Sequence, residues 1–192
     1  IRDLLEVDEG DPFNKLLHAK SINNLKSRNI FQDVQTKIID TPDANLKNID
    51  ITVEEKATGE VLVGAGVGSD GGTAQFSISE NNFLGKGIKL STGLRVSEER
   101  LRGNFTVVNP NFNYSDKSLS TDIFITDTDK LDDSGYKSTN AGFSFGTAFE
   151  QYDDFFFRPT FRTVYEELTT NSSASKNLKK QEGSYFTTDV GY

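Results

Sequence analysis

The 192-residue chain contains no cysteine and a single histidine, His18, and both shortages exclude kinds of site. Without cysteine, no disulfide framework, thiol chemistry or cysteine-based metal centre can form. A zinc site built from two or more histidines is excluded as well. A general base at His18 would need a nucleophile and an orienting partner that the sequence does not provide, so we expect a surface helix position for it. No catalytic residue, metal or cofactor is predicted.

Long apolar runs and excess positive charge are also absent. Hydrophobic residues make up 34% of the chain, its mean hydropathy is -0.51, and no run approaches the roughly 18 apolar residues of a membrane-spanning helix. A transmembrane β-strand needs only every second residue apolar, so a low average does not exclude a membrane. The net charge of -8 argues against nucleic acid as a partner, because phosphate binding needs clustered Lys and Arg.

What the sequence does contain is alternation of apolar with small or polar residues, beginning at Gly59. The segment from Gly59 to Ser69 has about the ten residues that a tilted strand needs to cross a bilayer. An Asp70-Gly71 turn then leads into a second alternating strand. One face of this pair is apolar and the other glycine-rich: Val61, Val63, Ala65, Val67, Ala74, Phe76 and Ile78 oppose Gly64, Gly66 and Gly68. The pattern indicates a β-hairpin of a membrane barrel.

Six further strands with the same two-residue period can be drawn, with an apolar outer face and a polar inner face. Outer positions include Leu90, Leu94, Leu101, Phe105, Ile123, Ile125, Phe143, Phe145, Phe155, Phe157, Phe161, Tyr165, Phe186 and Val190. Arg95, Arg102, Arg158 and Arg162 fall on the inner face, as ordinary lumen residues or as the lining of a selective pore. We expect short connections near 81–82, 109–110 and 150–154 and long ones at 127–138 and 168–184, as at the periplasmic and extracellular ends of an outer-membrane barrel.

Residues 1–56 show a different pattern. Asp11 is a plausible helix N-cap with Pro12 in the first turn, and apolar residues then recur at helical spacing as far as Leu25. Two short strands are predicted next, Val34 to Ile39 and Ile49 to Glu54, on either side of a turn. We therefore expect two domains, residues 1–56 and residues 57–192.

Two motif matches favour structural interpretations. Gly66 to Gly71 satisfies G-x-G-x-x-G, but a strand follows where a dinucleotide site needs a helix N-terminus, so we predict a glycine-rich hairpin. The aspartates at 127, 129, 132 and 133 lack the fifth-position ligand and sixth-position glycine of an EF-hand, so we predict a solvated loop.

Four short segments carry a resemblance to a known family. They are Leu25-Lys-Ser-Arg-Asn-Ile-Phe-Gln-Asp-Val34, Glu54-Glu-Lys-Ala-Thr-Gly59, Asn82-Phe-Leu-Gly-Lys-Gly87 and Asn109-Pro-Asn-Phe112. They resemble the BamA family, the outer-membrane protein assembly factor superfamily: the first is similar to the helix-to-strand passage of a POTRA domain, the second to the junction between POTRA domain and barrel, and the last two to periplasmic turns of the family's barrel. Asn29-Ile30 stands where Gly-Tyr is usual, and the Val-Arg-Gly-Phe type motif of the inward-folded loop is absent.

The resemblance implies a mainly β fold. Residues 1–56 would be the C-terminal part of the last POTRA domain, which is α+β. Residues 57–192 would be the first about eight antiparallel strands, the N-terminal half, of a transmembrane β-barrel of about sixteen strands. Since residue 1 is not Met and no leader precedes the first structured segment, we expect a fragment of a longer protein.

The resemblance also implies a function without bond chemistry, so we expect that the chain is not an enzyme. The protein would be the central component of a machine that folds and inserts β-barrel proteins in the bacterial outer membrane, with residues 1–56 in the periplasm. The implied partners are unfolded outer-membrane β-barrel clients, periplasmic lipoproteins and the lipid bilayer.

Two strands carry the predicted sites. Interior glycines remove cross-strand packing and raise the entropic cost of order, so the first barrel strand should pair weakly. The resemblance implies that this strand is a seam that opens to template incoming strands, whereas the alternative is that small residues fit a tight lumen or a bulge. The seam residues are Val61, Leu62, Val63, Gly64, Ala65, Gly66, Val67 and Gly68. A docking edge for partners is predicted at Val34, Gln35, Thr36, Lys37, Ile38 and Ile39.

Other functions share part of this pattern. A related translocation and assembly factor or a two-partner secretion pore would differ in the number of upstream POTRA units. A passive porin or surface antigen would explain the barrel strands but leave residues 1–56 without a role. A soluble all-β binding module would have to bury its Phe-rich faces in a second sheet, and detergent dependence would separate it from the others.

Overall fold

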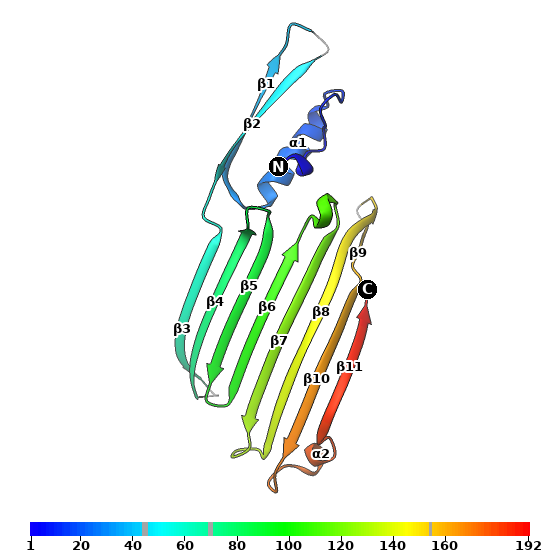
Figure 1. Ribbon diagram of the computed structural model, residues 1–192. Helices are drawn as coiled ribbons and strands as arrows, with labels where there is room; N and C mark the ends of the chain where they lie inside the picture. Colours follow the sequence, from blue (N-terminus) through cyan, green and yellow to red (C-terminus); the bar gives the residue numbers. More distant parts are fainter. Residues whose placement is uncertain (44–45, 69–70, 154) are drawn as a thin grey trace. The chain divides into compact units, whose positions relative to one another are not determined.

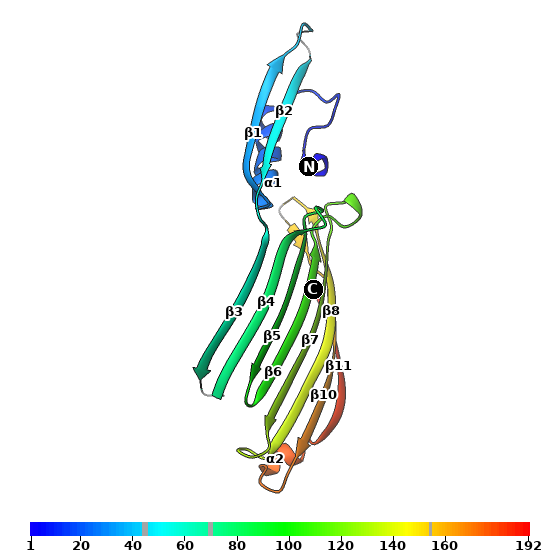
Figure 2. The same ribbon diagram turned by 60° about the vertical axis from the view of Figure 1, so that its left-hand side comes forward.

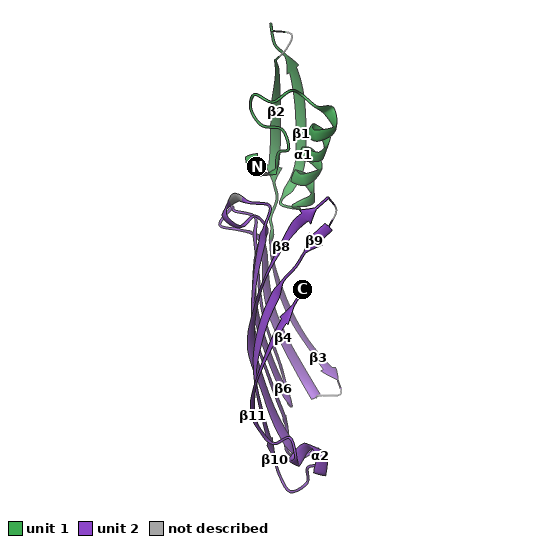
Figure 3. Cartoon of the chain, turned by 90° about the vertical axis from the view of Figure 1, so that its right-hand side faces the viewer, with its two compact units in different colours: residues 1–58 green, residues 59–192 purple. Residues whose placement is uncertain are grey.

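The computed structural model describes residues 1–43, 46–68, 71–153 and 155–192 and divides the chain into two compact units, residues 1–58 and 59–192 (Figure 3). The sequence pattern had suggested a division after residue 56. None of the helices in the described residues is long and apolar enough to span a membrane.

The first unit is a helix packed against two antiparallel strands (Figure 2). It contains a 3-10 turn, Arg2–Leu4, then α1, Lys15–Ser27, β1, Phe31–Asp40, and β2, Lys47–Glu55. The predicted cap at Asp11 is wrong, because the Asn14 Oδ1 atom accepts hydrogen bonds from the Leu16 N–H (2.8 Å) and the Leu17 N–H (3.3 Å). Asp11 instead accepts a hydrogen bond from the Asp8 N–H, so Pro12 precedes the helix.

The surface position predicted for His18 is also wrong. Its side chain is buried in α1, and its Nε2 atom lies 3.1 Å from the Thr36 hydroxyl on β1. Ser21 and Leu25 are buried on the same helix. The helix is therefore held to the sheet by a narrow stripe that includes polar groups, which a search for apolar periodicity does not detect.

The second unit is one antiparallel sheet of long strands (Figure 1). Its strands are β3, Gly59–Gly68; β4, Gly71–Phe83; β5, Ile88–Ser97; β6, Arg100–Asn109; β7, Ser118–Lys130; β8, Tyr136–Tyr152; β9, Phe155–Phe157; β10, Thr160–Thr170; and β11, Gly183–Gly191. The order across the sheet is β11-β10-β8-β7-β6-β5-β4-β3, and β9 pairs only with β8. The eight predicted barrel strands correspond to this path. Within the described residues the sheet stays open, with β3 and β11 at its edges.

One predicted strand is interrupted. The pattern from Phe155 to Tyr165 is split into β9 and β10 by Arg158-Pro159. Proline has no N–H to donate to a ladder, so a continuous strand is disfavoured there. The carbonyl of Pro159 still accepts a hydrogen bond of 3.1 Å from the Thr147 N–H of β8, which keeps the interruption attached to the sheet.

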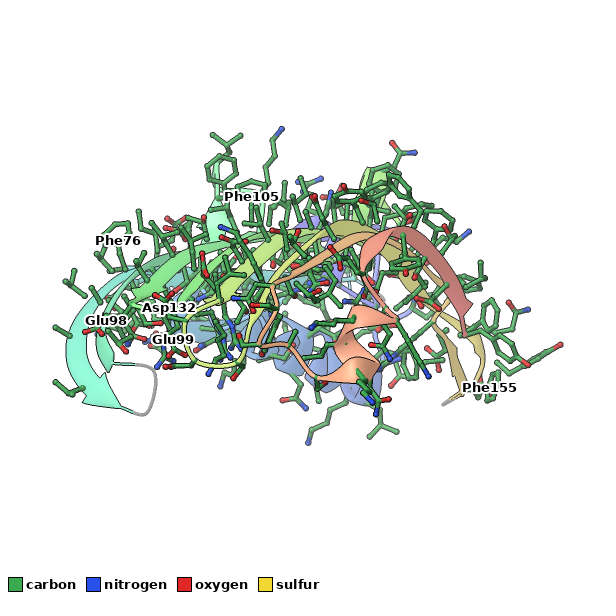
Figure 4. The ribbon with its side chains drawn as sticks, turned by 90° about the horizontal axis from the view of Figure 1, so that it is seen from below. Phe76, Glu98, Glu99, Phe105, Asp132 and Phe155 are labelled. Atoms are coloured by element: carbon green, nitrogen blue, oxygen red, sulfur yellow. The ribbon has the colours of Figure 1, made fainter. Side chains whose placement is uncertain are left out.

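The strand register places the predicted apolar positions on one face. Val63 lies opposite Phe76, and Phe76 lies opposite Leu94, while Phe105 lies opposite Ile123. The sheet is curved, and Phe76 and Phe105 project from its convex side, whereas Glu98, Glu99 and Asp132 gather at the concave side (Figure 4). The alternation therefore sorts apolar side chains to the convex face and polar ones to the concave face.

Phe124 departs from this alternation, since it shares the concave face with polar neighbours. A Cβ atom on Gly142 would come within 2.8 Å of the Phe124 ring, so the glycine leaves room for it. The Arg162 guanidinium lies 4.9 Å from the ring centroid, at cation–π distance. Its position is explained by this contact rather than by exposure to lipid.

The connections agree only in part with the predicted pattern. The long loop predicted at 127–138 is wrong, because β7 and β8 continue through most of it and leave a turn of residues 131–135. Lys137 lies 3.4 Å from the carboxylates of both Asp127 and Asp129, which holds the strand ends together. The connection at 171–182 is long as predicted and contains α2, Lys176–Lys179. At the other end, residues 110–117 form a connection with the 3-10 turn Phe112–Tyr114.

Candidate functional site

The predicted seam residues all lie in the edge strand β3. All 10 residues of β3 pair with β4, from Gly59 opposite Glu80 to Gly68 opposite Gly71. In the described part of the sheet, no strand pairs with the other edge of β3. Its apolar side chains are correspondingly open, and Val67 is 91% exposed. The predicted turn residue Asp70 lies outside the described residues, while Gly71 has a φ of 80° and belongs to β4.

The glycines at positions 64, 66 and 68 of β3 are in different surroundings, and Gly68 is the last residue of the strand. A Cβ atom at Gly64 would lie 2.9 Å from the Gln75 Nε2 atom, so the Gln75 side chain occupies that space. At Gly66 and at Gly68, a Cβ atom would meet no atom within 4 Å. Neither residue is among the positive-φ glycines, and the pairing of β3 with β4 has no register shift. Lack of space therefore accounts for Gly64 alone, and a bulge accounts for none of the three.

A polar hollow lies beside the glycine face of β3. It measures about 230 Å³, and Thr73, Gln75 and Arg95 line it together with the backbone of β3. Opposite pairs on this face are Gly66 with Thr73, Gly64 with Gln75, and Leu62 with Ser77. Leu62 is thus an apolar residue on the polar face, 42% exposed. The side of β3 that faces the concavity is otherwise small and polar.

A carboxylate from a neighbouring turn holds the end of the β3–β4 hairpin. The Gly72 N–H donates a 3.2 Å hydrogen bond to the Glu98 Oε1 atom in the turn between β5 and β6. A Cβ atom at Gly71 would lie 2.5 Å from the Glu98 carboxyl carbon, so this contact requires glycine there. The sequence analysis did not identify this role of Glu98, which is 26 residues from Gly72. The adjacent glycines Gly71 and Gly72 were the only sign in the sequence of a close approach at this position.

The adjacent Glu99 extends this connection to β7. Its carboxylate lies 2.7 Å from the Lys130 Nζ atom, and its carbonyl accepts a hydrogen bond from the Asp129 N–H. The Lys130 ammonium group beside Glu99 holds the pKa of the Glu99 carboxyl below its usual value, whereas the neighbouring Glu99 carboxylate raises the pKa of Asp133. The turn between β5 and β6 therefore bridges the β3–β4 hairpin and the β7–β8 hairpin.

The second predicted site, Val34 to Ile39, lies within β1. Within the described residues β1 pairs only with β2. The Val34 N–H donates a 2.8 Å hydrogen bond to Oδ1 of Asp33, and therefore points away from β2. Because hydrogen-bonding directions alternate along an antiparallel strand, the Thr36 and Ile38 N–H groups share that outer edge. Val34 is buried, but Ile38 is 42% exposed.

Two motif matches were interpreted as structural, the aspartates at 127, 129, 132 and 133 and the G-x-G-x-x-G match at 66–71. No group of three or more His, Cys, Asp or Glu side chains in the described residues is placed to hold a metal ion. Gly66 and Gly71 of the G-x-G-x-x-G match lie in β3 and β4, which are paired strands, and residues 69–70 between them are outside the described part.

Comparison with known proteins gives a consistent result. The model of the Omp85 superfamily domain matches residues 82–192. The outer membrane protein assembly factor BamA of Nitratidesulfovibrio vulgaris is 24% identical over 183 residues, which are 93% of this chain and 22% of that protein. This chain is also similar to a crystal structure of BamA from Haemophilus ducreyi lacking POTRA domains 1–3, with a TM-score of 0.73 and 19% sequence identity. The match covers 98% of this chain and 39% of the Haemophilus ducreyi chain. The chain thus spans about a fifth of the curated relative's length.

Proposed function

Because this chain belongs to the Omp85 superfamily, we propose that it is part of an assembly factor that folds and inserts other β-barrel proteins. Its location is the bacterial outer membrane, where the relatives it matches form β-barrels. The convex apolar face of residues 59–192 then faces lipid, and the concave face lines the lumen.

The observation that carries this proposal is the edge strand β3. In hydrocarbon, each unpaired backbone N–H or C=O group costs several kcal/mol. A client strand that pairs with the free edge of β3 satisfies its backbone groups as it enters the bilayer, by β-augmentation. Glycine at 66 and 68 lowers the stability of pairing there, although the space around both positions admits a side chain. A weak edge of this kind supports repeated opening and closing.

We further propose that the first unit is the C-terminal part of a periplasmic POTRA domain and that β1 is its docking edge. The helix, β1 and β2 form one packed unit, and Asn29 has a φ of 57° where the family pattern has glycine. Asparagine tolerates this left-handed conformation better than most residues do. The outward N–H groups of β1 would pair with extended segments of clients or of periplasmic lipoproteins.

Replacing the two unrestricted glycines should separate stability from assembly. Gly66→Ala combined with Gly68→Ala should stabilise the full-length protein by about 1–2 kcal/mol, because each glycine costs roughly 0.5–1 kcal/mol in a strand. The same variant should insert a client barrel into lipid vesicles several-fold more slowly, since the seam opens less often. Unfolding in denaturant and the appearance of folded client on gels measure the two effects.

A matched control is Gly93→Ala, which changes a concave-face glycine in β5, a strand inside the sheet. The added Cβ atom would lie 2.9 Å from the Asn104 Oδ1 atom and at ordinary contact distance from the Ser77 Cβ atom (3.6 Å) and the Phe76 carbonyl oxygen (3.8 Å). Client insertion should be unchanged in this variant. If the Gly66/Gly68 variant were more stable and inserted clients at the normal rate, seam weakness would have no part in the function. A passive porin would show no client insertion in any variant.

Proline substitutions on β1 should distinguish its two edges. Ile38→Pro removes an N–H that points to the outer edge, so the unit should fold while partner binding falls. Ile39→Pro removes an N–H directed at β2 and should unfold the unit, because a proline inside a ladder removes a hydrogen bond. Circular dichroism of the full-length protein measures folding. Co-purification of clients and lipoproteins with it measures partner binding. Normal co-purification with Ile38→Pro would exclude β1 as the docking edge.

A further inference from the structure

Two arginines face each other on the concave side of the sheet. Arg95 of β5 and Arg102 of β6 are direct cross-strand partners, and Arg95 in turn lies opposite Gln75 of β4. Like charges directly opposite each other destabilise an antiparallel pair. In the part of the chain that the structure describes, neither guanidinium has a hydrogen bond or an ion pair.

The other two inner-face arginines are placed differently. The Arg162 guanidinium lies 4.9 Å from the Phe124 ring centroid, and that of Arg158 lies 6.0 Å from the Phe156 centroid. Both contacts are within cation–π range. No such ring contact is found for Arg95 or Arg102 among the described residues. Packing therefore accounts for one pair of arginines and not for the other.

The unpaired arginines line a small polar cavity with donors on several sides. Thr73, Ser97 and Arg100 complete its lining, and its volume is about 110 Å³. That is room for roughly three to four waters at about 30 Å³ each, which suits one oxyanion with its hydration. Among the described residues, the lining contains guanidinium and hydroxyl groups and no carboxylate. Arginine presents its N–H donors in a fork that matches carboxylate and phosphate oxygens.

The cavity adjoins the seam strand. Thr73 and Arg95 line both this cavity and the hollow beside Gly64, Gly66 and Gly68. An anion held by Arg95 would therefore lie on the same face as the glycines of β3, away from the lipid-facing side chains.

We propose that Arg95 and Arg102, with the hydroxyl of Thr73, bind an oxyanion, a carboxylate or a phosphate group, on the concave face of the barrel wall. The anion offsets the repulsion between the two guanidinium groups and fixes β5 against β6. This site depends on the register of β5 and β6 and does not depend on whether β3 templates client strands.

The test is thermal unfolding of the full-length protein in detergent, with inorganic phosphate replacing chloride at constant ionic strength. The unfolding temperature should rise and saturate with phosphate, because a ligand that binds only the folded state stabilises it. Arg95→Gln and Arg102→Gln should each weaken the apparent affinity by about tenfold or more, as expected for losing charge-assisted hydrogen bonds. Without phosphate, neither substitution should lower the unfolding temperature, since each removes a repulsion. Arg102→Lys keeps the charge, loses the fork and should give an intermediate affinity.

A short blocked peptide that contains Asp and Glu, and the same peptide with Asn and Gln, identify the source of the anion. Stabilisation by the acidic peptide but not by its amide analogue assigns a protein carboxylate, and stabilisation by phosphate alone assigns a phosphate group. Arg162→Gln is the control, and it should keep the response of the unaltered protein. The proposal is overturned if phosphate and acidic peptide both leave the unaltered protein unchanged, or if the Arg95→Gln/Arg102→Gln variant responds to them as fully as the unaltered protein does.

Discussion

Joining β3 by a disulfide to the last strand of the closed parent barrel, which would pair with its free edge, should stop the assembly of other barrels. When the edge of β3 is permanently paired, its backbone N–H and C=O groups cannot pair with a client strand. The chain has no native cysteine, so a single introduced pair, with one member at Gly66, forms the only bridge that this chain can contribute to. Client insertion should fall to background under oxidising conditions and recover on reduction.

The control bridge lies inside the sheet. Ser79 of β4 and Ser91 of β5 are direct cross-strand partners on the concave face. A disulfide between Ser79→Cys and Ser91→Cys joins strands that stay paired throughout, so it should leave client insertion unchanged. Heat-modifiable migration on gels checks that both oxidised proteins remain folded. Client insertion at the normal rate with a fully oxidised seam would refute lateral opening and leave the protein at most a scaffold.

The second large effect concerns the two faces of the sheet. Val63→Arg, Leu94→Arg and Phe143→Arg each place a charge on the convex face, where their side chains are 76%, 48% and 44% exposed. Each should destabilise the inserted protein by about 2–4 kcal/mol near the bilayer midplane. Ser91→Arg, on the concave face opposite Ser79 and Thr106, should be tolerated better, because it faces a polar lumen.

Unfolding by denaturant in lipid vesicles measures these costs. Equal destabilisation by Leu94→Arg and Ser91→Arg, which lie in the same strand, would contradict the assignment of the faces. Ser91→Arg also adds another arginine to the face that holds Arg95 and Arg102, so Ser91→Gln serves as a neutral check on crowding.

The strands and their faces could be predicted from the sequence because both follow from a local rule. Successive side chains of a strand point to opposite faces, so the alternation around Val63, Phe76 and Phe105 identifies the convex face without knowledge of any partner. The register then follows from the hairpin turns, as between Ser97 and Arg100. The resemblance supplied the family and the expected location, which alternation alone could not.

The features that were predicted wrongly or missed depend on contacts between distant segments. His18 is buried because Thr36, 18 residues away, hydrogen-bonds its ring. Phe124 lies on the concave face because Gly142 leaves space for its ring and the Arg162 guanidinium makes a cation–π contact with it. Lys137 extends the β7–β8 pair into residues that look like a polar loop. A low-complexity sequence does not reveal which of its charges will be paired across strands.

In the candidate site too, some features follow from the local sequence pattern and others depend on contacts between distant segments. The position of β3 as a strand with interior glycines was readable from the sequence. Only the structure shows that Gln75 fills the space at Gly64, whereas Gly66 and Gly68 face open space. The hydrogen bond from the Gly72 N–H to Glu98 joins two hairpins, and no local pattern specifies it.

The most direct test of strand templating by β3 is cysteine cross-linking to a client during assembly. Single cysteines at Gly64, Gly66 or Gly68 of the full-length protein are paired with cysteines along the C-terminal strand of a client barrel. We expect disulfides at β3 in one register, lost when the client cysteine moves by one residue, because that shift turns its side chain to the other face. Phe143→Cys in the central strand β8 should give none. Failure of β3 to cross-link at any register, or equal cross-linking from Phe143→Cys, would contradict templating by this strand.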